Sequence, residues 1–574
     1  MATPTDPTTL ALTGQLPAIL ILATSLALPI SLLLLRLYRR AVLRSMRAGA
    51  PGSPSRSPPA RPAPPSGTPS PADLTITSSG RGAESVLEPA ARLLYAQLAR
   101  WRYRAAVAYA LGGFTFAAVM TSAFLVSGGI EFLPVRFLLL FWAYAWPVVF
   151  TTTLVLGSGL RTMLLSTAGY MAVFIALGAI GVARSPTFDW GQAALFWASN
   201  NLPPTVLLLF FLNRRVRAVG PLVLVFMVLA VTGAAVVVSL TGSSDSLMRA
   251  AVTAGSAIGL EATGIFVALH LLGFVLLGVV GWFALLWIRR RYERKQVSDE
   301  SITFDAIWLL FGVEQSIGLA FEGAWWVASG LVAFAGYKLV TFLALSSLLS
   351  RSGGDDSNAR LLLLRVFALG RRSERLFEAV GAYWRHAGSI QLIAGPDLIT
   401  KVIEPHEFLD FLSGRLARRF VDGPETLERR FSEMDLRRDH DGRFRVNEFF
   451  CHDDTWRDVL ARLVSQGDTV LMDLRSFSPA NAGVAYELGE LLDRVPLERV
   501  VFAIDRTTAR EYLRQIVEQA CGRLRATSPN LGRPVRLRLL EVEDSSSDIR
   551  HLLAALCAAT TSPVPAPSPT GALP

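Results

Sequence analysis

Long apolar runs constrain this chain more than any other feature of its sequence. Seven of them extend over about 20 residues or more, at 16–35, 104–127, 133–156, 161–183, 190–212, 218–240 and 262–288. A lipid core about 30 Å thick needs about 20 apolar residues in one helix. Because only 18% of the 574 residues are charged and 51% are hydrophobic, the sequence predicts a polytopic α-helical membrane domain, with the lipid bilayer as its first partner.

Arginine clusters at the ends of these runs predict the orientation of the chain. Basic residues gather on the cytoplasmic side of a membrane, in the loops next to the spans. Here they occur over residues 36–47, 100–104, 214–217 and 289–295. We therefore expect the N-terminus outside and residue 290 in the cytoplasm. Since only three of the 56 basic residues are lysines, the composition favours a GC-rich bacterium, and so the bacterial inner (plasma) membrane.

Residues 302–349 are apolar but interrupted by Glu314, Gln315, Glu322 and Gly323. Arginines follow again between 360 and 372, so this segment must cross the membrane an even number of times if the C-terminal part is cytoplasmic. We favour a hairpin of two helices that turns near Glu322 and Gly323, for nine spans in all. An interfacial or re-entrant segment over 304–321 is the alternative.

Composition divides the rest of the chain. Nine prolines lie between residues 50 and 72, which is typical of a disordered spacer. The expected organisation is a tail over 1–15, a first anchor over 16–38, a proline-rich linker and lead-in helix over 39–100, a multi-pass membrane domain over 101–350, an amphipathic arginine-rich helical connector over 351–388, a cytosolic α/β domain over 389–560, and a disordered tail over 561–574.

Short apolar strands alternate with amphipathic helices from residue 389 onward. Strands are expected at 389–394, 443–450, 469–473, 500–505 and, as an edge strand, 535–542, and helices at 403–420, 424–434, 456–464, 481–494, 507–525 and 548–558. Such alternation predicts a mainly parallel sheet covered by helices on both faces, a three-layer α/β domain.

Two of the expected strands end on a carboxylate, Asp473 and Asp505. Ligands of parallel α/β sheets bind beyond the carboxyl ends of the strands. Glu487 lies at the edge of the apolar stripe of the next helix, where desolvation and the nearby Asp473 would raise its pKa and suit it to general acid/base or nucleophilic chemistry. A structural role for Glu487, in an ion pair with an arginine such as Arg475, is the alternative.

The stretch from Asp473 to Gly489 reads DLRSFSPANAGVAYELG. Its strand-Asp, short turn and Gly-x-Ala-Tyr-Glu-Leu-Gly pattern resembles nucleoside 2-deoxyribosyltransferase-like domains and the related TIR-like domains. The resemblance implies a flavodoxin-like fold in which Glu487 attacks or stabilises the anomeric carbon of a ribose during N-glycosidic cleavage. Asp473 would then hold the sugar or base, and Asn481 and Gly483 would shape the turn beside the ribose.

Residues 445–456, RVNEFFCHDDTW, resemble a segment of uncharacterised bacterial multi-pass membrane proteins, which implies no function. The preceding DHDGRFRVNEF resembles most of an EF-hand loop. If Gly442 is the sixth position of such a loop and Glu448 the twelfth, the first and ninth positions are Arg437 and Arg445. Arginines at these positions favour a strand entered by an Asp-Gly turn instead.

Three cysteines without CxxC spacing indicate neither a zinc site nor a disulfide framework. No P-loop, HExxH or GxSxG motif occurs. We therefore expect no metal and no cofactor, and no nucleic-acid partner. Whether the chain forms a homo-oligomer is left open.

These features favour a membrane-anchored sensor or effector. Its α/β domain would bind a nucleotide or nucleoside-like small molecule, with Asp473 and Glu487 as candidate catalytic residues and Arg475, Asn481, Gly483 and Asp505 as candidate ligand-binding residues. Cleavage of an N-glycosidic bond is the activity that the resemblance implies. A non-catalytic membrane scaffold with a protein-binding C-terminal domain, and a transporter with a regulatory domain, are the alternatives.

Overall fold

The chain forms two compact units. In this computed structural model the described residues are 7–48, 75–79, 89–157, 159–184, 188–212, 219–320, 322–350, 359–366, 371–395, 405–439, 441–543 and 545–561. The helical unit comprises Met1–Tyr38, Arg102–Gly353 and Ile403–Leu412, and the α/β unit comprises Arg39–Trp101, Gly354–Val402 and Ser413–Pro574. The predicted linker over 50–72 and residues 562–574 of the predicted tail lie outside the described residues.

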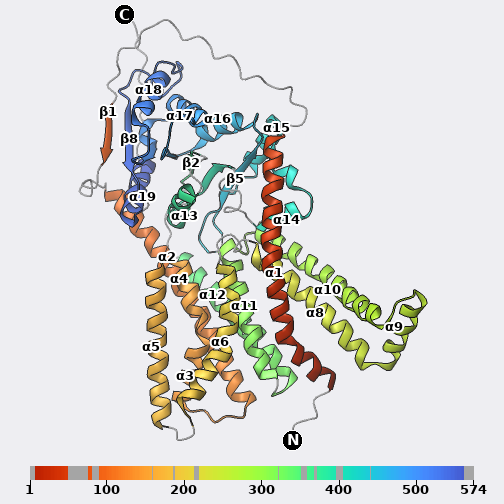
Figure 1. Ribbon diagram of the computed structural model, residues 1–574. Helices are drawn as coiled ribbons and strands as arrows, with labels where there is room; N and C mark the ends of the chain where they lie inside the picture. Colours follow the sequence, from red (N-terminus) through yellow and green to blue (C-terminus); the bar gives the residue numbers. More distant parts are fainter. Residues whose placement is uncertain are drawn as a thin grey trace, which may run out of the picture. The chain divides into compact units, whose positions relative to one another are not determined.

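Every predicted apolar run coincides with helix in the structure (Figure 1). The run over 133–156 is divided between two helices, and the expected tail over 1–15 is already helical from Pro7. The helices are α1 (Pro7–Arg47), α2 (Pro89–Ser127), α3 (Pro134–Tyr144), α4 (Pro147–Val155), α5 (Leu160–Arg184), α6 (Trp190–Leu212), α8 (Gly220–Ser243), α9 (Asp245–Ala257), α10 (Ala262–Glu293), α11 (Asp299–Ala320), α12 (Ser329–Ser350) and α14 (Pro405–Leu412).

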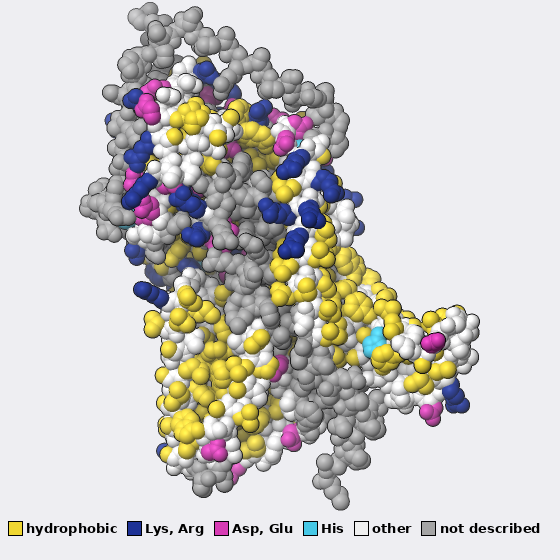
Figure 2. Space-filling model, viewed as in Figure 1, with side chains coloured by type: hydrophobic (Ala, Val, Ile, Leu, Met, Phe, Trp, Pro, Cys, Tyr) yellow, Lys and Arg dark blue, Asp and Glu magenta, His cyan; other side chains and the backbone are white. Residues whose placement is uncertain are grey.

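Five helical segments of the described residues are long and apolar enough to cross a membrane, and a bent pair adds a sixth if it counts as one span. Figure 2 shows hydrophobic side chains over the visible faces of α5 and α10, where Leu165, for example, is 73% exposed. Exposed apolar surface of this extent is stable in lipid and costly in water. The segments are Ala99–Ser127, Leu160–Arg184, Gly220–Ser243, Ala262–Glu293 and Ser329–Leu348, and the pair is Pro134–Tyr144 with Pro147–Val155.

The break between α3 and α4 has a local cause. Pro147 stands at the first position of α4 and brings no N–H group to the helix. The chain bends by 49° there. Two carbonyl groups at the break accept side-chain donors from other helices: Trp142 accepts from the Tyr170 hydroxyl at 2.8 Å, and Ala143 accepts from Asn201 Nδ2 at 3.2 Å.

The segment over 302–349 forms a helical hairpin, as expected. Helix α11 ends at Ala320, the short 3₁₀-helix η2 covers Ala324–Ala328, and α12 begins at Ser329. At the turn Gly323 has a φ of 152°, which an L side chain rarely adopts. The two helices approach closely at Gly312 and Gly330. A Cβ on Gly330 would overlap the Gly312 backbone, so the absence of a side chain allows this approach.

The α/β unit is built on one parallel sheet in the order β1-β8-β7-β6-β2-β3-β5-β4 (Figure 1). All neighbouring pairs of these described strands are parallel. The strands are β1 (Thr75–Ser79), β2 (Leu361–Arg365), β3 (Ile390–Ile393), β4 (Phe420–Val421), β5 (Val446–Cys451), β6 (Thr469–Asp473), β7 (Val500–Ile504) and β8 (Arg536–Glu541).

Helices cover both faces of the sheet, as expected from its continuous apolar strands. Leu362 and Leu364 of β2 pack in a core with α15 (Pro424–Ser432), α16 (Trp456–Gln466), α17 (Ala482–Arg494) and α18 (Arg510–Cys521). Leu361 and Leu363 point to the opposite core, with α13 (Arg371–Trp384) and α19 (Ser546–Thr561). The alternation along β2 therefore buries every leucine of the strand.

Three expectations for the chain after residue 350 are wrong. The segment 351–388, expected as a helical connector, contains the central strand β2 and only then α13. Four leucines in a row show neither helical nor strand periodicity. Burial of the segment on both of its faces favours a strand, which the sequence pattern alone could not show. The expected edge strand β8 pairs with β1 as well as with β7. The helix expected over 403–420 is divided into α14 and the 3₁₀-helix η4 (Leu416–Arg419).

Candidate functional site

The order in which the chain adds strands to the sheet changes direction between β2 and β6, although all strands stay parallel. From β2 the chain builds one side of the sheet with β3, β5 and β4, and then returns to build the other side with β6, β7 and β8. At such a switch point the connections leave in opposite directions, so a crevice opens at the carboxyl ends of the two strands. The two last residues here, Arg365 of β2 and Asp473 of β6, are partners in the register.

Asp473 forms a buried ion pair with Arg475. Arg475 Nε lies 2.8 Å from Oδ1 and Nη2 lies 2.9 Å from Oδ2, while the two side chains are 1% and 0% exposed. Arg475 also donates to the backbone carbonyl of Arg372, at the start of α13, at 3.0 Å. Arg475 thus joins the end of β6 to the first turn of α13. The arginine named as an example of a partner for Glu487 thus pairs with Asp473, and the arginine whose charge acts on Glu487 is Arg365.

Glu487 is buried, and one of its two carboxyl oxygens lacks a hydrogen-bond partner in the described part of the chain. The residue is 2% exposed, and Oε2 has no partner among the described residues. Burial raises the pKa of Glu487 to about 8, and the positive charge of the buried Arg365 opposes this rise only in part. The expected contribution of Asp473 to this pKa does not apply, because Asp473 is neutralised by Arg475. Glu487 therefore holds its proton at pH 7 more often than it loses it.

Asp505 follows β7 and is held by several donors. Oδ1 accepts from the Ser476 amide at 3.2 Å and from the Thr507 hydroxyl at 2.8 Å, and Arg372 Nη2 lies 2.6 Å from Oδ2. Burial disfavours the charged form of this carboxylate, but its hydrogen bonds, including one from Thr508, outweigh burial and lower the pKa to about 2. Asp505 is thus a fixed negative charge, unlike Glu487.

The turn between β6 and α17 is organised by its own polar side chains. Asn481 Oδ1 accepts from the Ser478 amide at 2.9 Å and from its hydroxyl at 3.1 Å, so Asn481 shapes the turn as expected. Ser476 has a φ of 56°, a left-handed conformation that is uncommon for serine and is found at strained functional turns. Gly483 has open space around it and is not needed for packing.

The structure adds three residues that the sequence interpretation placed elsewhere or overlooked. Arg365 and Arg372 were interpreted as membrane-flanking charges, and Ser476 was not singled out. An arginine that ends a four-residue apolar run is a signal that could have identified Arg365 as a strand end. We use the term switch-point cluster for the charged side chains at this edge of the sheet: Arg365, Arg372, Asp473, Arg475, Glu487 and Asp505. The loops after β2 and β3, over 367–370 and 396–404, lie outside the described residues.

The loop that resembles an EF-hand has its carboxylates paired with arginines. Arg445 Nη2 lies 2.9 Å from Asp439, and Arg443 Nε lies 3.3 Å from Asp441. Gly442 has a φ of 80° and makes the turn into β5. These contacts fit the expected Asp-Gly turn.

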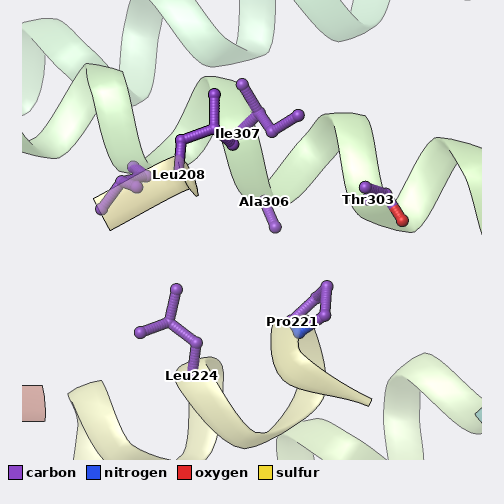
Figure 3. Close-up of a pocket in the computed structure, with 7 residues that line it drawn as sticks. Leu208, Pro221, Leu224, Thr303, Ala306 and Ile307 are labelled. Atoms are coloured by element: carbon purple, nitrogen blue, oxygen red, sulfur yellow. The ribbon is translucent and has the colours of Figure 1, made fainter. Parts of the chain in front are cut away.

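A small cavity in the helical unit offers no comparable chemistry. Its volume is about 20 Å³, roughly that of one water molecule. Figure 3 shows Leu208 of α6, Pro221 and Leu224 of α8, and Ala306 and Ile307 of α11 around it, with Thr303 as the polar residue of its lining. The switch-point cluster, with its buried charged side chains, is therefore the better candidate for a functional site.

Fold and site define a class of protein: apolar helices able to cross a membrane, joined in one chain to a parallel α/β unit with a buried charged cluster at its switch point. No family model matches the chain, and no curated protein or solved structure is significantly similar to it.

Proposed function

We propose that the α/β unit binds a nucleotide or nucleoside-like ligand at the carboxyl edge of β2, β6 and β7. The observation that carries this proposal is Glu487, a buried carboxyl group with an unpartnered oxygen, beside Arg365 at the switch point. A buried polar atom without a partner is costly unless a ligand or ion completes it. The cluster presents the guanidinium groups of Arg365, Arg372 and Arg475, which are donors suited to an anionic group such as a phosphate.

The strand order supports the resemblance to nucleoside 2-deoxyribosyltransferase-like and TIR-like domains. Counted along the chain without β1, β4 and β5, the strands β3-β2-β6-β7-β8 have the order 2-1-3-4-5, that of flavodoxin-like folds. We further propose that Glu487, in its ionised form, stabilises the anomeric carbon while the bond to the base breaks and water adds to that carbon. The water proton passes to the departing base. Such activity would rise with pH until Glu487 is ionised, at about pH 8.

Ligand binding is tested on the full-length chain in detergent. NAD, nucleoside monophosphates and free nucleosides are added in turn, and both heat of binding and released base are measured. We expect binding of a phosphate-bearing ligand, and a loss of base release of at least about 100-fold in Glu487→Gln, the usual scale for removing one electrostatic stabiliser of a transition state.

Glu498→Gln is the matched control, because Glu498 is exposed at the opposite end of β7. It should behave as the wild type. Binding without base release would leave a ligand-sensing domain and remove the enzymatic part. No binding of any of these ligands would contradict the proposal and favour a protein-binding scaffold.

We propose that the helical unit crosses a bacterial inner membrane nine times, with the N-terminus outside and the α/β unit in the cytoplasm, as a sensor or effector. The arginine clusters flanking the helices and the two-helix hairpin α11–α12 support an even number of crossings after residue 296. Reporter fusions after residue 296 and after residue 574 should both report cytoplasm. Opposite signals from the two fusions would refute this topology.

A further inference from the structure

A second group of buried polar side chains lies in the helical unit, around the break between α3 and α4. Asn201 of α6 is fully buried and donates to the Ala143 carbonyl at 3.2 Å. Its own oxygen, Oδ1, has no partner among the described residues. The same holds for both polar atoms of Gln315, which is 2% exposed, and for Oε2 of Glu314, both on α11. Three oxygens in this region therefore lack a donor.

Helix geometry places Asn201 and Glu314 near one another, and Gln315 follows Glu314 directly on α11. Leu208 of α6 and Ile307 of α11 line the same cavity (Figure 3). Asn201 precedes Leu208 by seven residues and Glu314 follows Ile307 by seven, about 10 Å along each helix at 1.5 Å per residue. Tyr144, next to the Ala143 carbonyl that holds Asn201, is within electrostatic reach of Glu314. The two helices therefore run antiparallel here and bring both residues to the break.

The polar donors around this region are already engaged elsewhere. Trp142 Nε1 donates to the Tyr170 carbonyl at 3.0 Å, Trp146 Nε1 to the Thr205 hydroxyl at 2.8 Å, and Trp197 Nε1 to the Tyr170 hydroxyl at 3.2 Å. On α12, the ammonium of Lys338 pairs with Asp305 at 2.8 Å. None of these described donors satisfies Glu314, Gln315 or Asn201.

We propose that Glu314, Asn201 and the neighbouring Gln315, whose side-chain oxygens lack a partner among the described residues, form a binding site for a small monovalent metal cation such as Na⁺. Carboxylate, amide and carbonyl oxygens are the donors that hard cations prefer. A single carboxylate balances one positive charge, which favours a monovalent over a divalent ion. Ionisable groups between apolar helices are rarely kept without a use. This site is independent of the switch-point cluster.

The test uses the full-length chain in detergent at fixed pH and ionic strength. Choline chloride is replaced stepwise by NaCl, KCl or LiCl, and thermal unfolding is followed through tryptophan fluorescence. We expect a saturable rise in Tm with one alkali cation, following mass action for a ligand of the folded state. Glu314→Gln should weaken the apparent affinity for that cation by at least about 10-fold, because it removes the charge that a bound ion needs.

Two further variants keep the test independent of folding defects. Asn201→Ala removes one oxygen and should weaken binding less than Glu314→Gln. Glu322→Gln is the matched control, since Glu322 is exposed beyond the end of α11. Binding of radioactive ²²Na⁺ to the same samples gives a direct second readout. Equal Tm in all salts, a response to pH alone, or an unchanged cation response in Glu314→Gln would each overturn the proposal.

Discussion

Replacing Asp473 with Asn should destabilise the α/β unit by about 3 to 5 kcal/mol, the usual cost of removing one partner from a buried ion pair. Arg475 is 0% exposed and would lose the two short ionic contacts that it makes with Asp473. The guanidinium of Arg475 would also no longer be held in place to donate its hydrogen bond to the Arg372 carbonyl. The change therefore loosens the edge that carries the switch-point cluster.

Hydrogen exchange on the full-length chain measures this effect locally. Amides of β6 and β7 should exchange at least about 100-fold faster in Asp473→Asn, because 1.4 kcal/mol corresponds to a factor of ten. The double variant Asp473→Asn/Arg475→Met should recover most of the loss, since it buries no unpaired charge.

The opposite end of β6 offers a matched control. Asp468 pairs with Arg360 at 3.2 Å, but both side chains are about one-third exposed. Asp468→Asn should therefore cost no more than about 1 kcal/mol, as for exposed pairs. Equal effects at Asp468 and Asp473 would show that burial of the ion pair does not govern the stability of this edge.

Glu487→Gln should make the α/β unit more stable at pH 9 and leave it nearly unchanged at pH 5. In the folded chain burial raises the pKa of Glu487 from 4.5 to about 8. The folded state therefore binds the proton more tightly than the unfolded state, so stability is highest below about pH 4.5 and falls as pH rises to about 8. At 1.36 kcal/mol per factor of ten in proton affinity, the full loss is about 5 kcal/mol. Glutamine keeps the shape of the protonated acid and does not ionise.

Thermal unfolding of the α/β unit between pH 5 and pH 9 measures this difference. For a unit of this size, about 5 kcal/mol corresponds to a Tm higher by about 10 to 20 °C in the variant at pH 9. The exposed Glu498 serves as the control, and Glu498→Gln should keep the pH dependence of the wild type. A Glu487→Gln curve parallel to the wild-type curve at every pH would mean that Glu487 is not the titrating group.

Much of the fold follows from local sequence patterns. The apolar runs predict the helices α1 to α6, α8 and α10, because 20 apolar residues in succession have few other stable arrangements. The strands β6 and β7 are also predictable, since Thr469–Asp473 and Val500–Ile504 are short apolar runs between helices. Strand β2 is not, because its four leucines fit a buried helix as well as a buried strand.

Site residues were predictable only where a residue ends a recognised strand or lies at the edge of the apolar stripe of a helix. This rule identified Asp473, Glu487 and Asp505, and burial of all three is found in the structure. It missed Arg365 and Arg372, because their places depend on β2, whose neighbours in the sheet come from distant parts of the chain. The distance along the chain also does not show which carboxylate lies within reach of Arg475, and only the structure shows that it pairs with Asp473.

The sequence by itself determined that this chain has membrane-type helices and an α/β part with carboxylates at strand ends, because apolar run length and strand-helix alternation are local properties. The tertiary structure alone decided that β2 lies at the centre of the sheet, that Asp473 pairs with Arg475, and that Glu487 is left buried beside Arg365. Burial and the choice of charge partner are set by which strands become neighbours. That choice depends on packing across the whole unit, and no short stretch of sequence contains it.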